Sequence, residues 1–320
     1  MIDYSDLVRV NKHIKDKIIT KENDILVCAR NGSQRLIGKN AIIKQEDANN
    51  TFGAFMMVYR ANDNPFILPL LSTKKYFSQV GENLGARINQ ITTSDFNGFE
   101  FYFPENHAER TKIAELFRLL DERIATQNKI IEDLKKLKSA ISERLFNAIK
   151  GDVVVLEDIG DVVKGKQING EFLSESGKYY VMNGGIEPSG FYNDYNVEAN
   201  TISISEGGNS CGYVQFNACP FWSGGHCYTI QNTTDNVKTE YLYQFLKSKE
   251  SEIMKLRIGS GLPNIQKKDL AKFKITIPNI SEQKVISAFL SSFERKADVE
   301  MNFVNLLLEE KQYLLRQMFI

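Results

Sequence analysis

The chain has 320 residues, enough for two domains of ordinary size, and its 40 Lys and Arg residues balance its 40 Asp and Glu residues. A net charge of zero argues mildly against a non-specific DNA-binding protein, which would carry an excess of positive charge. No apolar run approaches the length of a membrane-spanning helix, the N-terminus does not resemble a secretory signal, and the four cysteines show no paired spacing. We therefore expect a cytoplasmic protein with reduced thiols and no membrane partner.

The N-terminal part of the chain alternates short apolar runs with turn residues, which is typical of a small β-sheet. Phe99, Phe101 and Phe103 recur at every second position before Pro104, and this spacing predicts a further strand. The other expected elements are strands over residues 18–19, 24–28, 41–43 and 55–59 and a helical patch over residues 68–77.

A long helix is predicted over residues 109–146, because apolar residues recur there in two rows seven residues apart and form one continuous seam. Only Gln127 and Lys138 interrupt this seam. The seam residues are Ile113, Phe117, Leu120, Ile124, Ile131, Leu134, Ile141 and Leu145.

The seam occurs a second time, 173 residues later, and its interruptions recur with it as Glu300 and Lys311. A chance amphipathic helix would not repeat the polar positions, so we interpret the match as an internal duplication. The strand-rich pattern also restarts at residues 153–156. In this second half, residues 201–205, 259–265 and 273–278 match segments of the first half. The second seam consists of Ile286, Leu290, Phe293, Ala297, Val304, Leu307, Leu314 and Met318.

The two halves differ at one place. Residues 151–176 have no counterpart in the first half, because Met1 aligns near Gly177. The sequence therefore predicts that the first half lacks its opening strands, and an uncovered sheet edge invites pairing with another chain. We expect either weaker base discrimination by the first half or self-association that repairs it.

We predict an α+β fold with two similar strand-rich regions and a long antiparallel two-helix coiled coil, related by a pseudo-twofold axis. Gln127 and Glu300 should then lie near the middle of the helix pair. Two readers held apart by a rod would suit a split DNA target, as in dimeric repressors. The predicted domains are residues 1–103 (first strand-rich region, truncated), 104–150 (central helix), 151–277 (second strand-rich region) and 278–320 (C-terminal helix).

The tract of residues 259–265, the strand before Pro278 and residues 281–286 at the start of the second helix resemble specificity subunits of type I restriction-modification systems. The first half carries a looser copy in residues 89–91 and 119–124. The chain departs from the family pattern in its short first region and in residues 293–296, which replace the 120–123 version of the helix motif.

The resemblance implies a non-catalytic subunit that reads a bipartite sequence in double-stranded DNA. It implies two methyltransferase subunits docked on the helices and a motor-nuclease restriction subunit. S-adenosylmethionine, ATP and Mg are expected on these partners, so this chain should bind no cofactor. The charged helix faces opposite the seam are the expected docking surface, represented by Arg118, Arg123, Lys129, Glu132 and Asp133.

Candidate DNA contacts lie in glycine- and asparagine-containing turns with nearby donors, which could approach phosphates and base edges. The alternative is that these are ordinary turns between strands. The best-supported loop spans residues 257–268, where glycines and basic side chains coincide. The candidates are Arg30, Arg35, Arg87, Asn89, Lys164, Lys166, Gln167, Asn183, Asn209, Arg257, Ser260, Asn264, Lys267 and Lys268.

Other chemistries receive little support from the sequence. His226 with Cys211, Cys219 and Cys227 lacks the paired spacing of a zinc site, so we expect no metal. Tyr179, Tyr180, Phe191, Tyr192 and Trp222 could stack on bases, but their strand-like spacing is more typical of core residues. No catalytic set is evident. Two alternatives stay open: a coiled-coil adaptor whose strand-rich regions bind protein, and an enzyme with a site assembled from both copies.

Overall fold

The computed structural model describes residues 8–11, 13–84, 89–259, 261 and 263–319. It divides into two compact units, which we call the first unit (Met1–Lys129 with Glu300–Ile320) and the second unit (Ile130–Val299). Each unit therefore contains one strand-rich region and one part of each long helix. The division into four domains drawn from the sequence stays a prediction.

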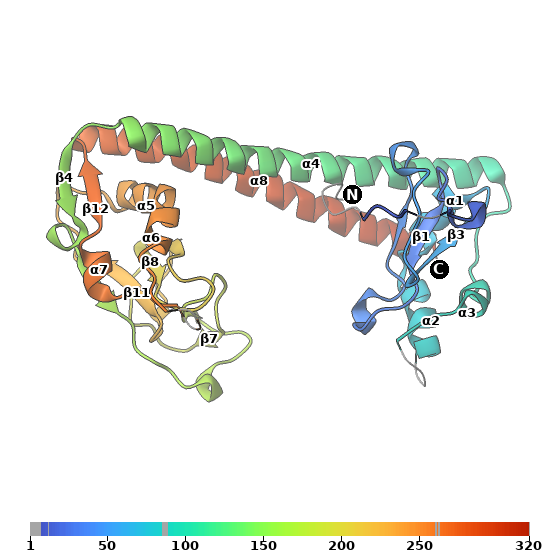
Figure 1. Cartoon of the computed structure of the whole chain (residues 1–320), viewed down its shortest axis with the longest axis horizontal. Helices are drawn as coiled ribbons and strands as arrows, with labels where there is room; N and C mark the ends of the chain where they lie inside the picture. The colour runs from blue at the N-terminus through green and yellow to red at the C-terminus, as the bar shows by residue number, and fades with distance from the viewer. Residues whose placement is uncertain (1–7, 12, 85–88, 260, 262, 320) are drawn as a thin grey trace. The chain divides into compact units, whose positions relative to one another are not determined.

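Each strand-rich region is followed in sequence by one long helix. Helix α4 spans His107–Ala148 and helix α8 spans Ile280–Met318, and both run without a break (Figure 1). Their observed ends lie within two residues of the ends predicted from the seam. None of the helices that the structure describes is long and apolar enough to cross a membrane.

The helices pair in opposite directions. In the first unit, Phe117 of α4 stacks on Phe319 of α8 with the ring centroids 6.0 Å apart, and the Arg123 guanidinium lies 5.4 Å from the Phe303 ring centroid. In the second unit, the Lys138 ammonium contacts the Glu294 carboxylate at 2.7 Å. Residue numbers on α4 rise as those of their partners on α8 fall, which confirms the predicted antiparallel pairing.

Every apolar residue predicted for the two seams is buried or half-buried. In the first unit, Ile113 and Phe117 join Leu315 and Phe319 in a cluster that also includes residues of the short helix α1 (Asn64–Leu70). In the second unit, Phe146 of α4 and Leu290 of α8 belong to the main core of the strand-rich region. The seam therefore anchors each strand-rich region to the helix pair of its own unit.

The polar interruptions of the seam make matching contacts between the two helices. Gln127 is only 3% exposed and donates from Nε2 to Glu300, as its predicted central position requires. Lys311 pairs with Asp121 in the first unit, and Lys138 pairs with Glu294 in the second. Each of these two pairs becomes the other when 173 is added or subtracted, so the duplication has preserved a cross-helix ion pair as well as an apolar pattern.

The first strand-rich region is a three-stranded antiparallel sheet in the order β2-β1-β3, packed against short helices. Ile25, Val27, Tyr76 and Ile91 form the centre of its core. Its elements are η2 (Asp16–Ile18), β1 (Ile25–Cys28), η3 (Gln34–Leu36), β2 (Asn40–Ile42), η4 (Gln45–Asp47), β3 (Met56–Tyr59), α1 (Asn64–Leu70), α2 (Lys74–Leu84) and α3 (Thr93–Asn97).

Two local predictions for this region need correction. Residues 18–19 do not form a strand: Ile18 ends η2, and Ile19 makes only an isolated bridge to Thr51. The run is too short to build a ladder. The helical patch over 68–77 is two helices, because α1 ends near Pro69 and the Thr73 hydroxyl accepts a hydrogen bond from the Tyr76 amide in the first turn of α2.

The strand predicted around Phe99, Phe101 and Phe103 is also wrong, since residues 99–103 form no strand. In the second unit, the matching strand β12 (Lys274–Ile277) pairs with β4 (Asp152–Val155), the first strand of the second strand-rich region. The described part of the first unit contains no counterpart of β4. Without a neighbour, the alternating sequence has no ladder to join, and Tyr102 is left 82% exposed.

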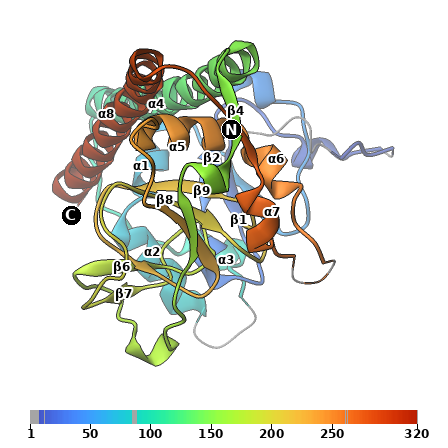
Figure 2. The same cartoon turned by 90° about the vertical axis from the view of Figure 1, so that its left-hand side faces the viewer.

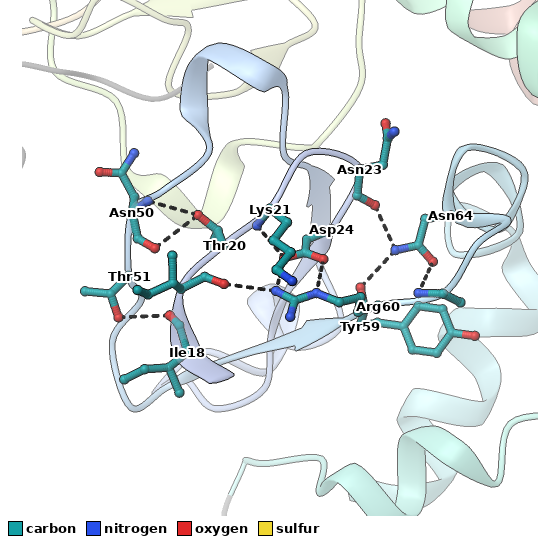
Figure 3. Close-up of polar contacts among 12 residues, drawn as sticks. Ile18, Thr20, Lys21, Asn23, Asp24, Asn50, Thr51, Tyr59, Arg60 and Asn64 are labelled. Atoms are coloured by element: carbon teal, nitrogen blue, oxygen red, sulfur yellow. Dashed lines mark hydrogen bonds and ion pairs between the residues drawn. The ribbon is translucent and has the colours of Figure 1, made fainter. Parts of the chain in front are cut away.

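A polar network fixes the start of β1 against the end of β3 (Figure 3). The Arg60 guanidinium donates from Nε and Nη2 to the two Asp24 carboxylate oxygens, both at 2.6 Å, and the Lys21 amide donates to Asp24 at 2.7 Å. Asn64 links the same corner to α1 by donating to the Asn23 and Tyr59 carbonyls at 2.8 and 2.9 Å. The buried Asp24 carboxylate therefore has hydrogen-bond donors for both of its oxygens.

The second strand-rich region contains a four-stranded sheet in the order β5-β11-β8-β9 and smaller strand pairings around it. Helix α5 packs on the helix pair, as Figure 2 shows: Tyr241 meets Phe146 edge to face and Gln244 donates to Glu294 at 3.0 Å. The strands are β4 (Asp152–Val155), β5 (Asp161–Lys164), β6 (Tyr179–Met182), β7 (Phe191–Tyr192), β8 (Thr201–Ser205), β9 (Val214–Asn217), β10 (Trp222–Ser223), β11 (Cys227–Gln231) and β12 (Lys274–Ile277). The helices are η5 (Leu156–Asp158), η6 (Gly170–Phe172), α5 (Thr239–Ser248), α6 (Glu250–Met254) and α7 (Lys267–Ala271).

Replacement of Leu307 by Ala should lower the free energy of unfolding by about 2–5 kcal/mol, because this seam residue is 8% exposed and its loss leaves a cavity. The adjacent Leu306 is 61% exposed, so Leu306→Ala is the matched control and should change stability little. Urea unfolding of the full chain measures both. Equal losses for the two variants would contradict the assignment of the seam.

Asp24 should make the first unit sensitive to acid. Burial alone would raise the pKa of the Asp24 carboxyl, but the hydrogen bonds from Arg60 and the Lys21 amide outweigh it and hold the pKa below its usual value. The resulting stabilisation is complete above the unfolded pKa of about 3.9 and is lost as the pH falls through the lower folded pKa. Asp24→Asn should therefore be destabilising at neutral pH, with a deficit that shrinks in this acidic window.

Unfolding measured against pH tests this prediction, with the exposed Glu22→Gln as the control. A deficit for Asp24→Asn that stays constant down to the lowest pH would show that the charge of Asp24 does not stabilise the fold.

Candidate nucleic-acid interface

The best-supported DNA loop closes onto the end of β8 in the second unit. Gly207 and Asn264 form a β-bridge, and the Ile265 amide donates to the Glu206 carbonyl at 2.9 Å. The Gly208 amide donates to the Pro263 carbonyl at 3.0 Å. Two turns that lie far apart in the sequence, both proposed from their glycines, therefore meet at the end of β8.

The first unit contains the same closure after β1. Arg30 and Gln90 form the matching bridge, the Ile91 amide donates to the Ala29 carbonyl at 2.9 Å, and the Asn31 amide donates to the Asn89 carbonyl at 3.3 Å. The sequence match between residues 85–91 and 259–265 thus corresponds to the same backbone contact in both units. The loop is a property of the repeated unit and not of one copy.

A buried carboxylate lies behind the second-unit loop. Glu206 is 8% exposed and contacts Lys164 Nζ at 2.6 Å, the Tyr228 hydroxyl at 3.1 Å and His226 Nδ1 at 3.7 Å. Burial, together with the neighbouring Glu206, raises the pKa of the Tyr228 hydroxyl above its ordinary value, so Tyr228 stays a neutral donor. Lys164 is therefore already paired with a carboxylate, which weakens it as a phosphate ligand.

Close backbone approaches bring three turns together beside this carboxylate. Gly184 has a φ of +83°, and a Cβ there would lie 2.9 Å from the His226 carbonyl. The Asn183 side chain accepts from the His226 amide at 3.2 Å, and the Gly165 amide donates to the Cys227 carbonyl at 2.9 Å. Glycines are required here because side chains would collide, which supports the structural interpretation of these turns alongside the functional one.

The exposed candidates in the second unit lie at the end of β5, in the turns and in α7, whereas Asn183 is half-buried and holds the His226 backbone. In the first unit, Arg30 lies over the Phe55 ring at 5.4 Å and Asn89 donates to the Gly32 carbonyl at 2.9 Å. Arg87 and Ser260 lie outside the described residues. The exposed candidates are Arg30, Arg35, Lys164, Lys166, Gln167, Asn209, Arg257, Asn264, Lys267 and Lys268.

The aromatic residues considered for base stacking are engaged within the protein. Tyr180 stacks on Phe221 with centroids 5.5 Å apart, and burial raises the pKa of Tyr180 to about 12. Tyr192 contacts Trp222 edge to face, and the Trp222 indole donates to the Lys166 carbonyl at 2.9 Å. Trp222 therefore positions the turn that carries Lys166.

His226 lies beside Glu206, whereas Cys211 and Cys227 are buried and Cys219 is exposed. Within the described ranges, no three His, Cys, Asp or Glu residues are arranged to hold a metal ion. Sequence reasoning missed Glu206 as a site residue. The one feature of the sequence that could have indicated it is that a carboxylate directly follows the strand of residues 201–205.

The outer faces of the helices are less polar than the sequence analysis assumed. Arg118, Arg123, Lys129, Glu132 and Asp133 are all exposed, as a docking surface requires. Large apolar residues are exposed beside them, and on α8 they recur at spacings of three, four and seven, a second row that the sequence analysis overlooked. We call Leu116, Leu119, Phe303, Leu306 and Tyr313 the first-unit apolar row, and Ile130, Leu137, Val285, Phe289 and Val299 the second-unit apolar row.

Two segments, residues 5–136 and 150–307, match the family model of the type I restriction modification DNA specificity domain. The chain belongs to this family. The two matched segments correspond to the two copies found by the internal repeat, each including a strand-rich region and most of its long helix. Membership confirms the resemblance noted in the sequence and the α+β fold class.

Several known proteins are similar to this chain in sequence. A protein of Mycoplasma pneumoniae named for a type I specificity subunit is 34% identical over 161 residues, and a counterpart from Mycoplasma genitalium is 32% identical over 158. These matches cover 50% and 48% of this chain but only 42% and 41% of the relatives. The MjaVIII specificity subunit of Methanocaldococcus jannaschii is 23% identical over 328 residues, covering 89% of this chain and 75% of the relative.

Solved structures share the fold. The S subunit of a type I restriction-modification system from M. genitalium superposes with a TM-score of 0.67 at 22% identity, over 97% of this chain and 86% of the other. A chain from a type I restriction-modification complex superposes with a TM-score of 0.58 at 16% identity, over 96% and 84%. The relatives are named as specificity subunits and not as methyltransferases or nucleases, in agreement with a non-catalytic chain.

Gly184→Ala should destabilise the second unit by at least about 1 kcal/mol, because the added Cβ meets the His226 carbonyl and the positive φ disfavours any side chain. Gly170→Ala is the matched control, since its Cβ would meet no atom within 4 Å, and it should stay within about 0.5 kcal/mol of the parent. Denaturant unfolding compares the two variants. A Gly184→Ala variant as stable as the parent would mean that the turns are not held in this close packing.

Proposed function

We propose that the chain is the DNA-reading specificity subunit of a type I restriction-modification complex, in which each strand-rich region reads one half of a bipartite target. The loop closure repeated in both units carries this proposal. It presents equivalent backbone turns and donor side chains twice in one chain, as recognition of two half-sites requires. Family membership supports DNA as the ligand class.

Charge distribution supports phosphate contact by the second-unit loop. The whole chain has no net charge, yet Arg257, Lys267 and Lys268 are all exposed around residues 259–264. Phosphate contacts by such side chains position a protein on the duplex without reading sequence. Lys164 contributes less in this account, since Glu206 already neutralises it.

Base reading requires donors and acceptors arranged for base edges. Asn and Gln side chains suit adenine, and Arg suits guanine. Gln167, Asn209 and Asn264 are exposed in the second unit, and Arg30 and Arg35 are exposed in the first. We assign sequence discrimination to these residues and positioning to the lysines.

The helix faces are proposed to dock two methyltransferase subunits. Each unit carries its own exposed apolar row, which offers a partner apolar surface to bury. Charged neighbours such as Arg118 and Glu132 would form the polar rim that such interfaces have. The methyltransferase subunits would bring S-adenosylmethionine, and a restriction subunit with ATP and Mg would join the assembled complex.

The competing proposal is an adaptor whose strand-rich regions bind protein. It uses the same apolar rows but gives no role to the exposed donors on the repeated loops. DNA binding in the presence of a methyltransferase partner therefore separates the two functions.

Lys267→Ala combined with Lys268→Ala should weaken binding to duplex DNA in a mobility-shift assay with the methyltransferase present. If both lysines contact phosphates, the negative slope of log K against log salt concentration should become shallower by about 2, roughly one for each lost contact. The loss of affinity should be similar for all DNA sequences. Lys284→Ala, exposed on α8, is the matched control. An unchanged salt slope would remove the loop from the interface, and no DNA binding by the parent complex would favour the adaptor.

Leu306→Asp should lower the number of methyltransferase subunits recovered per chain from two towards one, because it places a charge in the exposed first-unit apolar row and leaves the second-unit row unchanged. The change should not unfold the chain, since Leu306 is mostly exposed. Asn305→Asp adds the same charge at an exposed polar neighbour and should leave the complex intact. Equal recovery of the partner with both variants would place the docking surface elsewhere.

A further inference from the structure

We propose that His226 is a DNA phosphate ligand of the second unit, and that this contact requires a proton on the imidazole ring, which the buried Glu206 carboxylate positions. The inference rests on the proposed function, because it concerns how the second-unit loop holds DNA and how pH regulates that contact. Neither side chain was among the DNA contacts that the sequence suggested.

The backbone places His226 beside the candidate loop. The Glu206 amide donates to the His226 carbonyl at 2.9 Å, and the Glu206 carbonyl accepts from the Ile265 amide, also at 2.9 Å. A Cβ on the adjacent Gly225 would lie 2.5 Å from Gln167 Oε1, so the turn that carries Gln167 packs against the turn that carries His226. His226 therefore lies next to both the loop and a candidate for base reading.

The two carboxylate oxygens of Glu206 differ in their contacts. Oε1 contacts Lys164 Nζ at 2.6 Å and the Tyr228 hydroxyl at 3.1 Å. Oε2 is buried and accepts no hydrogen bond from the described residues, while His226 Nδ1 lies 3.7 Å from it. A buried oxygen without a donor is costly, and a protonated imidazole is a donor at both ring nitrogens. A small movement of His226 would give Oε2 its donor and leave the other ring nitrogen for a phosphate oxygen.

Protonation of His226 changes the charge of this corner. With a neutral imidazole, the charges of Lys164 and Glu206 cancel. With an imidazolium, one carboxylate faces two cations, which leaves one positive charge to attract a phosphate. The His226 side chain is 64% exposed, so a phosphate can reach the ring without any unfolding of the turn.

The other ionisable groups around Glu206 keep their charge states near neutral pH. Burial raises the pKa of the two thiols and of the tyrosine hydroxyl, so these three groups stay neutral. Lysine and arginine are cations in this range, whereas histidine ordinarily gains its proton there. The groups are Lys164 at the end of β5, Cys211 between β8 and β9, Arg257 after α6, and Cys227 and Tyr228 on β11.

The first unit carries a permanent cation at the matching place. The Phe55 carbonyl accepts from the amide that follows β1 at 2.9 Å, and the His226 carbonyl accepts from the amide that follows β8 at 2.9 Å, so the two rings occupy equivalent positions. Arg30 and Gly207 are also equivalent, because each forms the β-bridge that closes its loop. The Arg30 guanidinium lies 5.4 Å from the Phe55 ring centroid. The second unit has a glycine in place of this arginine, and a protonated His226 would supply a cation at the same corner.

The test measures binding of a labelled random-sequence duplex to the full chain, with the methyltransferase present, from pH 8 to pH 6 at constant ionic strength. A random sequence suffices because phosphate contacts carry no sequence information. A nearby phosphate favours the charged imidazole, so DNA binding takes up a proton and should tighten as the pH falls. Uptake of one proton limits the effect to about tenfold per pH unit. The salt slope should also be steeper by about one at pH 6 than at pH 8.

His226→Gln should remove this share of the pH dependence, and His226→Lys, a permanent cation, should bind more tightly than the parent at pH 8. Both substitutions are at an exposed side chain, so the fold should be retained. His107→Gln is the matched control, because His107 is exposed in the first unit beside Asp63 and should not affect the contact. The methyltransferase brings its own titrating groups, so the decisive quantity is the difference between the parent and His226→Gln.

Glu206→Gln tests the positioning role. The imidazolium then lacks its carboxylate partner, so the pH at which binding tightens should move to a lower value. A Glu206 with a structural role alone would change the affinity equally at every pH. Equal pH dependence in the parent and in His226→Gln would overturn the inference and leave the proposed function intact. No binding of DNA by the parent complex at any pH would overturn both.

Discussion

Two cross-helix ion pairs inside an otherwise apolar seam fix how this chain is assembled. Lys138 pairs with Glu294 and Lys311 with Asp121. A lysine left unpaired in a helix interface is costly, so any shift of register or reversal of direction that separates these partners is disfavoured. The Gln127 contact with Glu300 alone would fit a parallel pair in register as well, because the two positions are equivalent in the repeat. The lysine pairs remove that ambiguity.

The duplicated seam gives each strand-rich region the same relation to its own part of the helix pair. The loop closure after β1 and after β8 then recurs with the same backbone hydrogen bonds, and the exposed apolar residues of the helices recur in both units. One ancestral unit with this loop closure and an exposed apolar helix face would yield both features on duplication. The family match to two separate segments of the chain agrees with this origin.

The sequence predicted what depends on local periodicity or on the repeat: both long helices, their seam and the main strands. It failed where the structure depends on an absent or distant neighbour. Residues 99–103 alternate like a strand, but no counterpart of β4 pairs with them in the part of the chain that the structure describes. Glu206 gains its role only when Lys164, His226 and Tyr228 converge from other strands. The apolar rows were overlooked because the seam already accounted for one helix face. The DNA contacts proposed for individual residues stay predictions.

Crosslinking within one chain tests the antiparallel register most directly. With Cys28 and Cys219 replaced by Ser, the double variant Asp121→Cys and Lys311→Cys should form an intramolecular bridge with a short thiol crosslinker. The double variant Asp121→Cys and Glu294→Cys should not, because Glu294 lies about 26 Å along α8 from Lys311 at 1.5 Å per residue. A parallel pair would reverse this outcome, since Asp121 and Glu294 are equivalent in the repeat. Efficient bridging of 121 to 294, without bridging of 121 to 311, would contradict the account.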